Sequence, residues 1–291
     1  MTDDIDRLRA EALASNKCFT KGRLKDELRM RPKDDAMPVK TYKGRFGDRY
    51  GVYLVADCVP LRKLTSKAGF SAKQLASHKS LAMRAKLKSR MARAGSVAQK
   101  LLSDKPYFLD TETTGLGCDA QIIELAVCDA LGNSVFNSRI RPTVDIEPEA
   151  MAVHGISMDD LLTAPGWLEV SDQIREILQD RLVIAFNASF DLRLMRQTAE
   201  AAGDNRDWID VLQVSCAMAL SVDAFGATNR HGTISLASSL SAIGVCHRGA
   251  AHQAMTDALA VRDLVVSLAE HYEEIKTTIS CAHEKTPTLK E

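Results

Sequence analysis

The stretch of sequence that decides the fold is YFLDTE, residues 107–112, an apolar run that ends in two carboxylates. In a β-strand, side chains two residues apart point to the same face. Asp110 and Glu112 are therefore expected to project together at the end of a buried strand. Two carboxylates this close repel each other, so one must be protonated unless a cation neutralises the pair. Divalent cations that prefer oxygen ligands supply such a charge.

The residues after this strand predict a mixed α/β sheet covered by helices. Two further strands are expected at 121–130 and 134–142, and the turn between them is Gly132-Asn133. The other expected elements are a buried strand at 181–186 and helices at 191–202, 211–220 and 251–275. A meander followed by a strand that alternates with helices is typical of such a sheet.

Two later motifs add carboxylates to the first pair. Asp191 follows the apolar strand and the turn NASF, and Asp257 follows His252 on the last helix. Taken singly, Asp191 is an ordinary helix cap, Asp257 a solvated helix residue and His252 a surface group. The three motifs together, in this order, favour one shared site.

These motifs resemble those of the DnaQ-like DEDDh 3′→5′ exonucleases, most closely the proofreading-subunit type of DNA polymerase III. They are DTETTGL at 110–116, NASFD at 187–191 and a histidine and an aspartate five residues apart at 252–257. Supporting matches are IIELAV at 122–127 and PEAMAVHGIS at 148–157. The resemblance covers about residues 106–272 and leaves the first 105 residues without a family.

The resemblance implies a ribonuclease-H-like fold and a two-metal mechanism. Asp110, Glu112, Asp191 and Asp257 would hold two Mg²⁺ or Mn²⁺ ions, and His252 would act as the general base. The expected reaction releases nucleoside 5′-monophosphates from single-stranded DNA or frayed 3′ ends. An exoribonuclease of the same fold and a non-catalytic nucleic-acid-binding or polymerase-associated adaptor are the alternatives. The complete set of acidic residues and histidine argues against the adaptor.

By the same resemblance, several residues would bind the terminal nucleotide. Thr113, Thr114 and Leu116 would hold it, with Leu116 wedged against the last base. Asn187 and Phe190 would line the same cleft. Turn formation and packing explain these five residue types equally well.

The formal net charge is zero, but the two parts of the chain have opposite charge. Residues 1–105 hold 25 Lys+Arg and 11 Asp+Glu, whereas residues 106–291 hold 13 and 27. Residues 58–103 contain 11 basic residues and no acidic one. The zero net charge therefore does not exclude a polyanionic partner.

The basic part contains a candidate nucleic-acid platform, in which cations would contact phosphates and rings would stack on bases. Two strands around Gly47-Asp48, within residues 39–59, and a basic helix after them would carry it. Its members are Lys40, Tyr42, Lys43, Arg45, Phe46, Arg49, Tyr50, Lys79, Arg84, Lys88, Arg90 and Arg93. A hairpin whose rings pack inward, a solvated basic face, and docking onto the acidic part of the chain are the other interpretations.

The expected domain organisation is a small basic α+β domain at 1–105, the exonuclease domain at 106–279 and a polar tail at 280–291. No secretory signal or membrane span is expected from the sequence. Seven scattered cysteines without a Cys-x-x-Cys pair favour a reducing cytoplasm. The expected partners are single-stranded 3′ ends and a polymerase or other replication or repair protein.

Overall fold

The computed structural model describes residues 2–44, 49–61, 78, 81–82, 85–247 and 252–284. Their contacts divide the chain into two compact units, each assembled from separate stretches. Unit 1 comprises Met1–Ala98, Met218–Ala242 and Leu268–Glu291, and unit 2 comprises Gln99–Ala217 and Ile243–Ser267. The expected boundary after residue 105 lies close to the first change of unit. The assignment of functional domains along the chain stays a prediction.

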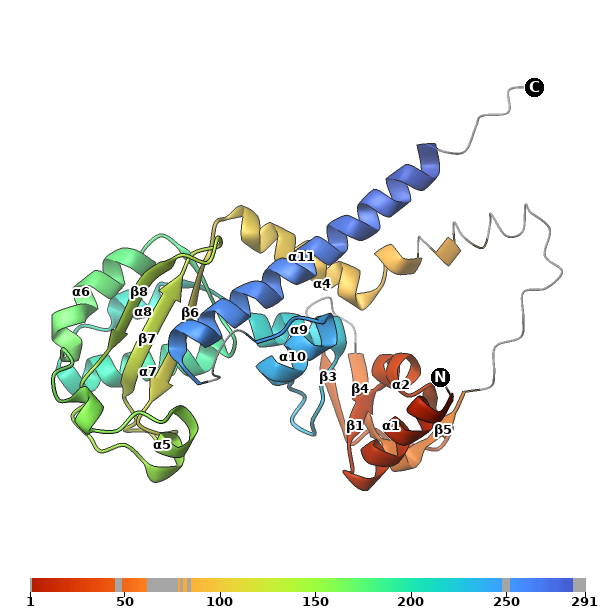
Figure 1. Cartoon of the computed structure of the whole chain (residues 1–291), viewed down its shortest axis with the longest axis horizontal. Helices are drawn as coiled ribbons and strands as arrows, with labels where there is room; N and C mark the ends of the chain where they lie inside the picture. Colours follow the sequence, from red (N-terminus) through yellow and green to blue (C-terminus); the bar gives the residue numbers. More distant parts are fainter. Residues whose placement is uncertain are drawn as a thin grey trace. The chain divides into compact units, whose positions relative to one another are not determined.

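Unit 2 is built on a five-stranded mixed sheet with the strand order β10-β9-β6-β7-β8. The strand β7 is antiparallel to β6 and β8, whereas β9 is parallel to β6 and β10. Figure 1 shows β6, β7 and β8 side by side. The bounds are β6 Tyr107–Thr113, β7 Ile122–Cys128, β8 Ser134–Arg139, β9 Leu182–Ala185 and β10 Gln213–Cys216. The predicted mixed α/β sheet flanked by helices is confirmed.

Helices pack against this sheet through their apolar faces. The helices α6 and α7 bury Trp167, Ile174 and Leu194 in one cluster with Leu109 and Leu125 of the sheet. Removing these side chains from water is the main term that holds the helices to the strands. The helical elements of unit 2 are α5 Pro148–His154, a 3-10 turn at Asp159–Leu161, α6 Trp167–Leu178, α7 Ala188–Ala202, α8 Asp207–Asp210 and the first turns of α11, Ala254–Glu284.

The predicted helix over residues 211–220 is wrong. The first part of that stretch is the edge strand β10, whose Gln213 and Cys216 pair with Leu182 and Ala185 of β9. The helix α9, Ala217–Phe225, begins only after this strand. A four-residue strand is too short to show an alternating pattern, so its pairing partner decides its conformation.

Unit 1 contains a three-stranded sheet with the order β1-β4-β3 and a separate pair, β2-β5. The predicted hairpin is present as β3 and β4, which pair antiparallel. The elements are α1 Thr2–Ala14, β1 Cys18–Thr20, α2 Lys21–Glu27, β2 Met30–Pro32, β3 Lys40–Lys43, β4 Arg49–Leu54, a 3-10 turn at Val55–Asp57, β5 Cys58–Pro60, the start of α4 Arg90–Ser103, α9, α10 Leu236–Ile243 and the end of α11.

The stretch Met218–Ala242 completes the packing of unit 1. The Tyr42 hydroxyl accepts a hydrogen bond from the backbone N–H of Ala227 at 2.9 Å, and the Tyr50 hydroxyl donates to Asp223 Oδ1 at 3.2 Å. The hairpin and this later stretch therefore form one structure, although about 180 residues of sequence separate the bonded pairs.

The helix α4 continues through Gly95 without interruption. A Cβ at this position would lie 2.4 Å from the Leu268 carbonyl oxygen and 2.7 Å from Tyr272 Cβ. Glycine is therefore present because two helices approach closely there, and not because the helix ends. Among the described helices, none combines the length and apolar character of a membrane span.

Candidate active site

The strand β6 positions the first two carboxylates. Asp110 lies opposite Ala126 of β7, and Glu112 lies opposite Glu124. The apolar residues Phe108 and Leu109 of the same strand are buried, which fixes β6 in the sheet. Glu112 is itself only 8% exposed. The alternation of the strand thus brings Asp110 and Glu112 to one face, as predicted.

Asp191 lies in the first turn of α7, directly after β9. Its side chain is buried, and its Oδ1 accepts a hydrogen bond from Thr111 Oγ1 at 2.9 Å. The helix cap is Asn187, so Asp191 does not have the ordinary capping role. Because β9 runs parallel to β6, the start of α7 lies beside the end of β6 that carries the first two carboxylates.

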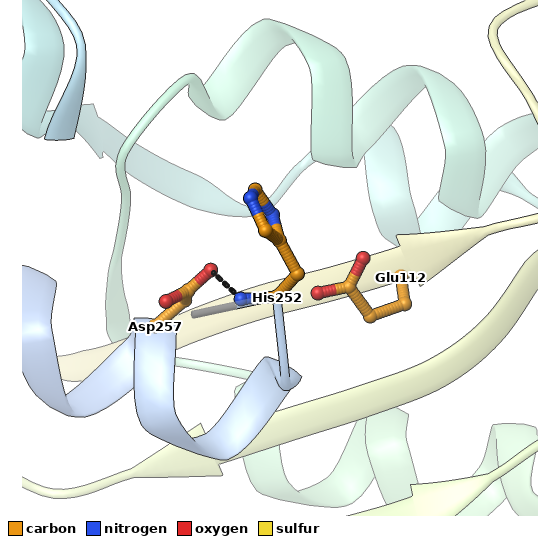
Figure 2. Close-up of side chains that lie close together, drawn as sticks. All are labelled: Glu112, His252 and Asp257. Carbon is orange, nitrogen blue, oxygen red and sulfur yellow. Dashed lines mark hydrogen bonds between the residues drawn. The ribbon is translucent and has the colours of Figure 1, made fainter. Parts of the chain in front are cut away.

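The start of α11 brings in the last two residues. The backbone N–H of Ala254 donates to Glu124 Oε2 at 2.9 Å, which ties this end of the helix to β7. Asp257 Oδ2 accepts a hydrogen bond from the backbone N–H of His252 at 3.2 Å. Ligand atoms of Glu112, His252 and Asp257 all lie within 4.8 Å of one another. Figure 2 shows the two carboxylates on either side of His252.

The backbone of His252 is strained. Its φ is +63°, in the left-handed region that costs a side-chain-bearing residue about 1–2 kcal/mol. Strain of this kind collects at functional sites, where the surrounding structure holds it in place. Here the hydrogen bond to Asp257 and the anchored start of α11 hold His252 beside the carboxylates.

Burial raises the pKa values of three clustered carboxylates, and neighbouring negative charges raise two of them further. Burial and the charges of Asp191, Asp257 and Glu112 hold the pKa of Asp110 well above its usual range. Burial, followed by the charges of Asp257 and Glu124, raises the pKa of Glu112 to about 8. Burial raises the pKa of Asp191 to about 7, although the hydrogen bond from Thr111 opposes this rise. The site therefore concentrates negative charge that a bound cation would relieve.

The donor set fits a hard divalent cation. Carboxylate oxygens are the ligands that Mg²⁺ and Mn²⁺ prefer. Glu112 and Asp257 already lie close enough to share one ion. Asp110 and Asp191 are near enough to interact electrostatically with each other. The structure thus brings together all five residues that the motifs singled out.

Comparison with known families agrees with this geometry. The model of an exonuclease family, RNase_T, matches residues 107–265, from the first residue of β6 into α11. The chain belongs to the RNase_T exonuclease family. The matched range contains all five site residues, and the prediction of a DnaQ-like DEDDh 3′→5′ exonuclease is confirmed.

Several curated proteins are similar to this RNase_T exonuclease. An uncharacterized exonuclease of Escherichia phage 186 is 32% identical over 179 residues, which cover 60% of this chain and 92% of that protein. An uncharacterized protein of Salmonella typhimurium is 42% identical over 124 residues, covering 43% of this chain and 88% of that protein. The DNA polymerase III subunit epsilon of Escherichia coli is 33% identical over 98 residues, covering 30% of this chain and 40% of that protein.

The residues expected to bind the nucleotide surround the end of β6 and the start of α7. The hydroxyl of Thr113 donates to the Gly115 carbonyl, and that of Thr114 accepts from the Gln121 backbone N–H, so both are engaged within the loop. In contrast, Leu116 is 74% exposed. Asn187 is exposed, and Phe190 is half-buried against the core.

The structure separates the candidate platform into exposed cations and packed rings. The rings of Tyr42 and Tyr50 contact each other edge to face at 4.3 Å, and the Arg90 guanidinium lies 4.5 Å from the Tyr50 ring centroid. Arg93 is half-buried. The exposed cations are Lys40, Lys43, Arg49 and Lys88. Arg45, Phe46, Lys79 and Arg84 lie outside the described residues.

The sequence analysis assigned no role to two polar residues that contact the site, Glu124 and His247. Glu124 of β7 lies opposite Glu112 of β6 and anchors α11, and its place in the apolar run IIELAV could have indicated this. His247 Nε2 lies 2.7 Å from Asp257 Oδ1, and no sequence pattern marks this contact. His154, which lies in the matched segment PEAMAVHGIS, accepts a hydrogen bond at Nδ1 from the Ile156 backbone N–H, and burial lowers its pKa.

Proposed function

We propose that this enzyme hydrolyses the terminal phosphodiester of single-stranded DNA or frayed 3′ ends and releases nucleoside 5′-monophosphates. The observation that carries the proposal is the convergence of Glu112, His252 and Asp257 within 4.8 Å, beside Asp110 and the buried Asp191. A cluster of carboxylates is suited to bind divalent cations and, through them, a phosphate.

The four carboxylates would bind the cations, and the histidine would transfer the proton. Asp110, Glu112, Asp191 and Asp257 would hold two divalent cations, Mg²⁺ or Mn²⁺. When bound, the cations would neutralise charge on the phosphate and the leaving oxygen and lower the pKa of the attacking water. His252 is exposed beside the cluster, where its imidazole can accept the proton of that water. The hydrogen bond from its backbone to Asp257 keeps the base next to the cluster.

A nuclease assay tests this proposal. The full chain is incubated with 5′-labelled single-stranded DNA and, in parallel, RNA of the same sequence, with Mg²⁺ or Mn²⁺ and with EDTA. We expect a ladder that shortens from the 3′ end, needs a divalent cation and is faster on DNA. The variant Asp110→Asn should lose the ladder. Faster degradation of RNA would favour the exoribonuclease, and a parent chain as inactive as Asp110→Asn would favour the adaptor.

The exposed cations of unit 1 are proposed to contact the phosphate backbone of the substrate strand. Lys43, Arg49 and Lys88 are exposed, and each phosphate contact adds about −0.7 to the slope of log K against log salt for a single strand. The packed rings Tyr42 and Tyr50 are assigned no stacking role, because both are held inside unit 1.

Point substitutions test this surface better than deletion of the first 100 residues. Unit 1 also contains Met218–Ala242 and Leu268–Glu291, which deletion would leave without their packing partners. We expect Lys43→Ala and Arg49→Ala each to weaken binding of the single strand. Each should also reduce the slope of log K against log salt by the amount of about one phosphate contact. Arg31→Ala, which removes an exposed arginine paired with Asp34, is the control. Equal slopes in all variants would exclude the surface.

The partner and compartment also follow as proposals. We infer a polymerase or another replication or repair protein as the partner, because one relative is named as a polymerase III subunit. A cytoplasmic setting is supported by six free cysteines among the described side chains. Co-elution of the full chain with a replicative polymerase tests the first proposal.

A further inference from the structure

Two side chains of α7 fix the loop between β6 and β7. Gly117 lies in this loop, and its carbonyl oxygen accepts hydrogen bonds from Arg193 Nη1 and Gln197 Nε2, each at 3.1 Å. The Gln197 amide also donates to the Ala120 carbonyl at 3.2 Å and accepts from Arg193 at 2.6 Å. Arg193 and Gln197 lie four residues apart, so they share one face of the helix.

The base of the same loop is held independently. The Thr114 backbone N–H donates to the Gln121 carbonyl at 2.8 Å, and the Thr114 hydroxyl accepts from the Gln121 N–H at 2.9 Å. The loop between these anchors is therefore fixed at its base and near its tip. Leu116 projects from it with 74% of its surface exposed. An exposed apolar side chain on a loop that is held in place is available to pack against the base of a terminal nucleotide, as the proposed function requires.

Arg193 also contacts the other wall of the expected nucleotide cleft. Its guanidinium lies 5.1 Å from the centroid of the Phe190 ring, within cation–π range. Phe190 packs partly against the core cluster of the sheet. One side chain thus touches both the loop that carries Leu116 and the aromatic ring at the start of α7.

We propose that Arg193, assisted by Gln197, is a positioning residue that holds Leu116 and Phe190 in place against the base of the terminal nucleotide. This inference rests on the proposed function. Arg193 acts through the loop and the ring and does not touch the reacting phosphate. Its contribution should therefore depend on the presence of a base at the 3′ end, whereas a residue that only stabilised the fold would affect all substrates equally.

The test compares two single-stranded DNA substrates that differ only in the 3′-terminal nucleotide. This nucleotide carries a base in one substrate and is abasic in the other. For Arg193→Ala we expect kcat/KM to fall about tenfold on the base-bearing end and less than about twofold on the abasic end, since hydrogen bonds to charged groups are among the stronger ones. Gln197→Ala should show the same pattern with a smaller loss. Arg193→Lys should recover part of the activity.

The matched control is Arg196→Ala on the same helix, which removes an arginine that pairs with Asp210. Its effect on kcat/KM, if any, should be the same for the base-bearing and the abasic substrate. Equal losses on both substrates for Arg193→Ala and Gln197→Ala, or no loss on either, would overturn the positioning role. A parent chain that degrades neither substrate would instead overturn the proposed function. Should Arg193→Ala fail to fold, Gln197→Ala and Arg193→Lys carry the test.

Discussion

Replacing Glu112 with glutamine should remove a pH-dependent penalty on the stability of unit 2. Burial and neighbouring charges raise the pKa of Glu112 from 4.5 to about 8 in the folded chain. The folded state then keeps a proton that the unfolded chain has lost, so stability falls as pH rises from 4.5 to 8 and levels off above 8. For this single group the loss between pH 5 and pH 9 is about 4 kcal/mol. Glutamine has the same shape and no proton to lose.

The assay is urea unfolding in EDTA at pH 5 and pH 9, followed by tryptophan fluorescence. Both tryptophans of the chain, Trp167 and Trp208, belong to unit 2, so the signal reports the unit that contains the site. We expect Glu112→Gln to match the parent within about 1 kcal/mol at pH 5 and to exceed it by about 4 kcal/mol at pH 9.

A second measurement connects this penalty to the cation. Addition of Mn²⁺ at pH 9 should stabilise the parent, because the ion neutralises the carboxylates, and should stabilise Glu112→Gln much less. Glu176→Gln, which changes an exposed glutamate on α6, is the control for loss of a charge alone. Identical stability of parent and Glu112→Gln at both pH values would refute the raised pKa of Glu112 in the folded chain.

Other consequences of the structure are open to measurement. His252→Ala should lower kcat by about 10²–10⁴ while leaving strand affinity in Ca²⁺ within twofold, because only the proton acceptor is removed; unchanged kcat would exclude the imidazole as the base. Thr111→Val removes the hydrogen bond to Asp191 and should raise the Mn²⁺ concentration needed for half-maximal rate. A lower Mn²⁺ requirement would show instead that this bond restrains Asp191 from binding the ion. Gly95→Ala should destabilise the chain by about 1–3 kcal/mol, since its Cβ would overlap the Leu268 carbonyl; a thermal melt equal to that of the parent would mean that the helices move apart freely.

The chemistry of the site could be predicted from short motifs because strand and helix periodicities are local. Asp110 and Glu112 lie two residues apart in a strand, so their side chains point to the same face. The turn NASF places Asp191 at a helix start. The order of these motifs, with the histidine and aspartate that follow, indicated the exonuclease family. The sequence could also predict the meander and the long final helix, whose apolar spacings are regular.

Long-range packing decided the features of the fold that the sequence pattern did not predict. The strand β10 exists because Gln213–Cys216 pairs with β9, and Gly95 is needed because α11 passes close to it. The rings Tyr42 and Tyr50 pack inward because a stretch about 180 residues later supplies their partners. Such contacts join residues that no local pattern connects, so they depend on the folded arrangement alone.

The site itself also combines features set by local sequence with features set by long-range packing. The five residues of the cluster were determined by residue type and spacing. The roles of Glu124 in anchoring α11, and of Arg193 and Gln197 in fixing the loop of Leu116, were decided by tertiary structure. The physical reason is that a catalytic group needs a particular functional group, which the sequence shows directly. A positioning group needs only a donor or an acceptor at the right distance, and many residues could supply it.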